Sequence, residues 1–154
     1  MNPTTSGAAP DLPPGRTRTV VVTAVMVVIA LAHALRVGTW LRGSRFRLYY
    51  AYFSDIAIPF GVYLLLCLRA ERVPFLQDWR ARAALVFGAA SFAEAMQAFG
   101  VPLLGRTFDP IDIAMYGAGI LLAVFVDRVL LARLLPGWAP KSTRPSEQAR
   151  ATSP

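Results

Sequence analysis

Four long apolar segments dominate the chain and limit what it can fold into. They occupy residues 19–41, 49–68, 83–104 and 111–135, and arginine-rich stretches lie between them. Each is long enough to cross a hydrocarbon core of about 30 Å as an α-helix that rises ~1.5 Å per residue. Of the 154 residues, 55% are hydrophobic and only 16% are charged, as is typical of membrane proteins. The sequence therefore predicts an all-α, polytopic membrane protein, an antiparallel bundle of four transmembrane helices.

Two polar tails flank the predicted transmembrane domain of residues 19–135. Residues 1–18 and 136–154 are rich in proline and small polar residues, so both are expected to be disordered cytoplasmic tails. The arginines before the first apolar segment, together with Ala30, Ala32 and Ala34 within it, also fit a secretory signal cleaved near Ala32. Against cleavage, apolar sequence resumes after Arg36 and continues to Trp40, a typical interfacial anchor.

The net charge of +7 is spread over the connections between apolar segments. With the N-terminus inside, most arginines fall on the cytoplasmic side, and only Arg42, Arg45, Arg47 and Arg106 fall outside. This distribution predicts that both termini are cytoplasmic. Because the arginines do not form one basic face, we interpret them as topology signals and expect no nucleic-acid partner.

Polar residues interrupt all four apolar segments in the half predicted to be outermost. These residues are His33, Arg36, Asp55, Glu94, Gln97, Asp112 and Tyr116. Lipid does not tolerate such groups, so we expect them to face inward and to pair with one another. Glu94 is either a functional ionisable group or a carboxyl group hydrogen-bonded to Gln97 or Ser91. For His33, packing or an ion pair with a carboxylate is the expected role.

The turn before the fourth segment contains Arg106 and Asp109. A guanidinium group near a helix N-terminus suits a phosphate or carboxylate ligand. In the alternative, Asp109 caps the helix and Arg106 neutralises a neighbouring carboxylate.

Small residues in the third and fourth segments predict close helix packing. They are Gly88, Gly119 and Ala123. Near the inner end of the fourth segment, snorkelling and lipid headgroup contact account for Asp127, Arg128 and Arg133.

One group of residues resembles a known family. Glu94, Gln97, Arg106, Asp109, Asp112, Tyr116 and Gly119 follow the pattern of the VanZ-like family of small bacterial integral membrane proteins. The founding member of that family is associated with glycopeptide resistance. Asn is usual at the place of Tyr116, and a second Gly is common at that of Ala123. The resemblance implies a multi-pass protein of the bacterial cytoplasmic (inner) membrane, and it carries no settled biochemical activity.

Three functions are compatible with this sequence. We favour a non-enzymatic protein that binds an anionic lipid or phosphorylated cell-envelope precursor in the outer polar pocket. The first alternative is proton or cation transport through Glu94, Asp55 and His33. The second is an intramembrane lipid-modifying enzyme, for which the sequence offers no nucleophile and base at catalytic spacing. With one cysteine, Cys67, and one histidine, the chain has no Cys/His metal motif, and we expect no metal or cofactor.

Overall fold

The computed structural model describes residues 14–35, 43–101, 109–135 and 138, which are mostly helical and include no strand. Its long helices are α1 (Pro14–Ala34), α2 (Ser44–Arg69), α3 (Trp79–Ala98) and α4 (Pro110–Phe125). A short 3-10 helix, η2 (Pro74–Gln77), connects α2 to α3. From α4 the chain continues through a π-helical turn, η3 (Val126–Leu131), into α5 (Ala132–Leu134). The all-α prediction is confirmed, whereas Arg36 and Arg106 lie outside the described residues.

Three helical stretches in the described part of the chain are long and apolar enough to cross a membrane. They are Gly15–Ala34, Tyr52–Arg69 and Pro110–Leu134, and they correspond to three of the four predicted spans. The α3 helix does not qualify, because Arg82, Glu94 and Gln97 interrupt its apolar sequence. All three of these side chains are buried within the protein. A crossing by α3 therefore stays a prediction.

The helix ends differ from the predicted ones where proline and glycine act. The α1 helix begins at Pro14 rather than at residue 19, since proline suits the first turn of a helix. The α3 helix ends at Ala98 rather than at residue 104, and Gly100 follows it with a φ of 79°, which favours glycine. At the start of α4, Asp109 is the N-cap and Pro110 the first helical residue, close to the predicted start.

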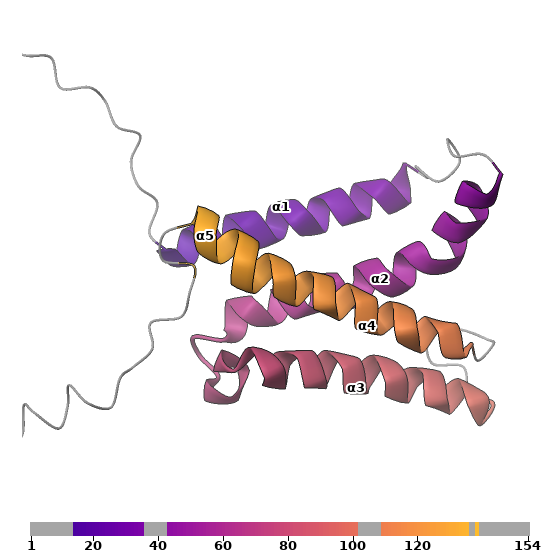
Figure 1. Ribbon diagram of the computed structural model, residues 1–154. Coiled ribbons are helices and arrows are strands. Elements are labelled where there is room, and N and C mark those ends of the chain that lie inside the picture. The colour runs from indigo at the N-terminus through magenta and orange to yellow at the C-terminus, as the bar shows by residue number, and fades with distance from the viewer. Residues whose placement is uncertain (1–13, 36–42, 102–108, 136–137, 139–154) are drawn as a thin grey trace, which may run out of the picture.

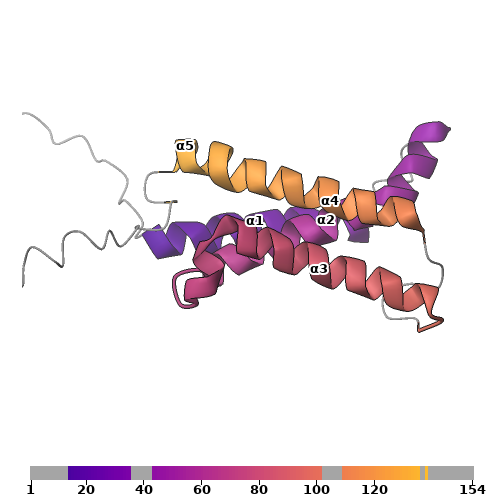
Figure 2. The ribbon, with the colours of Figure 1, turned by 60° about the horizontal axis from the view of Figure 1, so that its bottom comes forward.

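The helices pack around α2, which contacts α1, α3 and α4, while α3 also contacts α4. Figure 1 shows the start of α1, the η2 connection and α5 at one end of the molecule, here called the η2 end. The end of α3 and the start of α4 lie together at the opposite end, here called the Asp109 end. Figure 2 shows the same grouping from a second direction.

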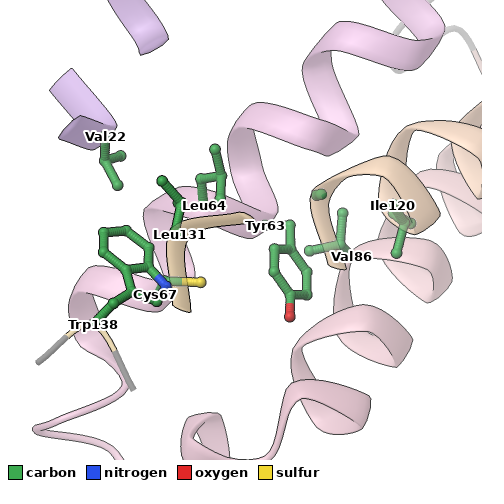
Figure 3. Packing of buried hydrophobic residues seen from close by; sticks show 9 residues of the cluster. Val22, Tyr63, Leu64, Cys67, Val86, Ile120, Leu131 and Trp138 are labelled. Atoms are coloured by element: carbon green, nitrogen blue, oxygen red, sulfur yellow. The ribbon is translucent and has the colours of Figure 1, made fainter. Parts of the chain in front are cut away.

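A cluster of buried side chains from the four long helices, from η3 and from the residue after α5 that the structure describes forms the core (Figure 3). Its members are Val22, Tyr63, Leu64, Cys67, Val86, Ile120, Ala123, Leu131 and Trp138. Beside this cluster, Gly119 brings α4 against α2, because a Cβ atom there would lie 2.3 Å from the backbone oxygen of Ile56. The predicted packing role of Gly88 is wrong: this residue is exposed, and a Cβ atom there would meet no described neighbour within 4 Å.

Candidate functional site

The carboxylate of Glu94 joins α3 to α4 at the Asp109 end. Glu94 is only 1% exposed. Its Oε2 atom accepts hydrogen bonds from Gln97 Nε2 and from the Tyr116 hydroxyl, each at 3.1 Å. Its Oε1 atom accepts the backbone N–H of Asp109 at 2.9 Å. We call these four residues the Glu94 clamp.

Local sequence explains how the clamp forms. Glu94 and Gln97 are spaced i to i+3, so they share one face of α3. The side chain of Asp109 accepts the N–H of Ile111 at 2.9 Å, which confirms the predicted cap. The N–H of an N-cap residue has no partner inside its own helix, so that of Asp109 is available to Glu94.

Tyr116 supplies the remaining donor of the clamp. Its hydroxyl donates to Glu94, as an amide could, so the phenol keeps a donor at the position where the VanZ-like pattern has Asn. The expected contact between Glu94 and Gln97 is present. The alternative contact with Ser91 is not, since the buried Oγ atom of Ser91 has no hydrogen-bond partner among the described residues.

Two further carboxyl groups lie beside the clamp. Asp55 on α2 and Asp112 on α4 are half-buried and lie close enough to interact with each other and with the carboxyl groups of Glu94 and Asp109. We call these four acidic residues the acidic corner. Because like charges repel at short range, Asp55 and Asp112 can either share one proton between them, as their side-chain hydrogen bond indicates, or attract a positively charged group. The predicted anionic ligand depends instead on Arg106, which the structure does not describe.

His33 does not join the acidic corner. One ring nitrogen contacts the carbonyl oxygen of Ile29 and the other the hydroxyl of Ser54, both at 3.1 Å, and its ring centroid lies 5.0 Å from that of Phe53. Of the two expected roles of His33, the structure shows packing, against Phe53, and no ion pair with a carboxylate among the described residues. Ser54 precedes Asp55 by one residue and projects from a different face of α2, which separates His33 from the acidic residue beside it in sequence.

A second polar group, which we call the Asp127 cluster, lies at the η2 end. Its centre is an ion pair between Arg82 Nη2 and Asp127 Oδ2 at 2.8 Å, with the two residues 2% and 6% exposed. Tyr63 donates to the same Oδ2 atom at 3.0 Å, and the indole N–H of Trp138 donates to Oδ1 at 2.8 Å. Arg82 also donates from Nη1 to the carbonyl oxygen of Leu76 at 2.6 Å.

The Asp127 cluster corrects several predictions. Asp127 is buried and paired rather than exposed at a lipid interface, whereas Arg128 and Arg133 are exposed as expected. Trp138 is 4% exposed, although it lies in the predicted disordered tail; most of that tail is outside the described residues. A sequence signal did exist for Asp127, since it lies four residues after the buried Ala123 on the same face of the helix. The π-helical turn that contains it has no such signal, and turns of this kind are frequent at functional sites.

Arg18 connects α1 to this cluster. It forms an ion pair with Glu71 and donates to the carbonyl oxygen of Trp138. Its guanidinium carbon lies 5.9 Å from the centroid of the Trp138 ring. Arg18 and Trp138 also line a small cavity together with Cys67, Ala70, Arg82 and Asp127. Since both arginines have acidic partners, the charges of the cluster are balanced.

The polar groups do not form a metal centre. Within the described ranges, no group of three or more His, Cys, Asp or Glu residues could hold a metal ion.

Comparison with known proteins leaves the family open. No family model, curated protein or solved structure matches the chain. The VanZ-like resemblance is therefore a hypothesis that rests on the residues themselves.

Proposed function

We propose that this chain is a multi-pass membrane protein of VanZ-like type whose acidic corner binds the headgroup of a membrane lipid or envelope precursor. In this proposal four antiparallel helices cross the bacterial cytoplasmic membrane, both termini are cytoplasmic, and the Asp109 end is external. Three described helical stretches are apolar enough to cross a membrane, which supports this proposal. The polar groups of α3 have partners on α2, α4 and η3, which reduces the cost of placing this helix in lipid.

The pair of half-buried carboxyl groups on Asp55 and Asp112 carries the proposal of a ligand. Glu94 already accepts three hydrogen bonds, so its oxygens have little capacity left. Asp55 and Asp112 come from different helices and remain partly open. Together they suit an amine, so we narrow the expected anionic ligand to a headgroup that carries both a phosphate and an amine. Arg106, three residues before Asp109 in sequence, is the proposed contact for the phosphate.

Native mass spectrometry of protein released from native membranes tests this proposal. We expect the wild type to retain a discrete amine-bearing phospholipid or precursor, and Asp112→Asn and Arg106→Ala to lose most of it. Gly88→Ala, a change at an exposed position with open space, is the matched control and should retain the wild-type lipid. Equal lipid retention by all four proteins would show that the acidic corner does not bind lipid.

Proton or cation transport is the second candidate, and one observation favours it. The acidic corner extends from the half-buried Asp55 and Asp112 to the fully buried Glu94, as a relay of carboxyl groups would. However, both oxygens of Glu94 already accept hydrogen bonds, and His33 contacts Ser54 instead. Flux into proteoliposomes decides between the candidates: flux in the wild type that Asp55→Asn abolishes would support transport over simple binding.

A further inference from the structure

Trp138 is held in the Asp127 cluster through both its side chain and its backbone. The indole N–H donates to Asp127, the carbonyl oxygen accepts from Arg18, and the ring lies under the Arg18 guanidinium group. Figure 3 shows Trp138 beside Cys67 in the buried cluster. These contacts attach Trp138, which follows the last turn of α5, to the helical body.

Trp138 lines a small, partly open cavity. The cavity has room for about one water molecule, and its lining includes Arg82, Asp127 and Cys67. The Nε atom of Arg82 is buried and has no hydrogen-bond partner among the described residues. Removing the indole would enlarge this space and bring water closer to Arg82, whose Nε donor has no protein partner to lose.

The surrounding ion pairs do not depend on Trp138. Without the indole, Asp127 still accepts from Arg82 and Tyr63, and Arg18 still pairs with Glu71. Release of Trp138 thus breaks a few contacts at one end of the molecule and leaves those between the helices in place. Local opening of this kind needs less free energy than global unfolding.

We propose that Trp138 is a latch: when docked it covers the Arg82–Asp127 pair and Cys67, and when released it admits more water to them. Docking of Trp138 is thereby coupled to solvent access at the Asp127 cluster. This device is independent of the lipid site at the opposite end of the molecule.

Cys67 provides a direct measurement of the latch. It is the single cysteine of the chain, is 6% exposed and lines the same cavity as Trp138. We expect N-ethylmaleimide to label Cys67 slowly in the full-length wild type and about tenfold faster or more in Trp138→Ala. Trp138→Phe should label at an intermediate rate, because it keeps an apolar ring but cannot donate to Asp127.

A control variant separates the latch from general loosening. Leu134 lies on α5 and is 65% exposed, so Leu134→Ala should label at the wild-type rate. Equal rates in the wild type and Trp138→Ala, or an equal increase in Leu134→Ala, would overturn the proposal. If circular dichroism shows that Trp138→Ala has lost helix, the test rests on Trp138→Phe. Faster labelling of Cys67 in that variant, with an unchanged melting temperature, would support the latch. An unchanged labelling rate would reject it.

Discussion

Glu94 is the residue on which the contact between α3 and α4 at the Asp109 end depends. Glu94→Ala would leave the donors of Gln97, Tyr116 and Asp109 without their acceptor. We expect a loss of about 1–3 kcal/mol in the free energy of unfolding. Glu94→Gln keeps one acceptor oxygen but turns an NH₂ group toward a donor, so its loss should be smaller.

Thermal unfolding of the purified variants in detergent checks this order of stability. The melting temperature should fall from wild type to Glu94→Gln and further to Glu94→Ala. If the melting temperature of Glu94→Ala equals that of the wild type, the carboxylate does not stabilise the contact between α3 and α4.

For contacts between individual residues, sequence spacing predicted those between near neighbours in the chain and missed those between distant residues. The Asp109 cap and the Glu94–Gln97 contact join residues two or three positions apart, where helix geometry fixes which side chains meet. The bond between Arg82 and Asp127 joins residues far apart in sequence, and no local pattern specifies it. The contact of His33 with Ser54 was not predicted for a related reason, because it depends on how α1 packs against α2.

Among the helices, the close approach of α4 to α2 depends on Gly119. Gly119→Ala would place a methyl group 2.3 Å from the backbone oxygen of Ile56, and a backbone atom cannot move aside as a flexible side chain can. The two helices must then separate, at a cost of about 1–3 kcal/mol in stability. Gly88→Ala is the matched control, since its methyl group meets open space and the change should be neutral or stabilising by up to about 1 kcal/mol. Comparable melting of the two variants would contradict a close contact at Gly119.

A buried ion pair joins α3 to the π-helical turn. Removing one partner leaves an uncompensated buried charge, so Arg82→Ala and Asp127→Ala should each destabilise by about 3–5 kcal/mol. The double variant Arg82→Met with Asp127→Leu removes both charges and should be more stable than either single variant. Arg128→Ala, at an exposed neighbouring position, should change stability by less than about 0.5 kcal/mol. Chemical denaturation checks this order, and additive losses in the double variant would show that the two side chains are not coupled.

Across the whole molecule, composition predicted the helical fold, but it could not show how α3 tolerates its polar residues. Apolar length alone identifies α1, α2 and α4. In α3, Arg82 and Glu94 can be buried because α2, the N-cap of α4 and η3 supply their hydrogen-bond partners. The same arrangement places one buried polar group at each end of the interface between these helices, with Val86, Ile120 and Ala123 among the core residues on α3 and α4.

We therefore predict that α3 crosses the membrane only when the other helices of the protein are present. In a full-length Cys67→Ser background, Gln77→Cys and Phe99→Cys place thiols at exposed positions on either side of α3. If α3 crosses, an impermeant maleimide added to intact cells should label Phe99→Cys, whereas Gln77→Cys should react only after lysis. Arg133→Cys, near the other end of α4, should behave like Gln77→Cys. A chain that ends at residue 101 lacks α4 and η3, which supply partners for Glu94 and Arg82, so labelling at residue 99 from outside should fall. Labelling of residues 77 and 99 from the same side in the full-length protein would show that α3 does not cross the membrane.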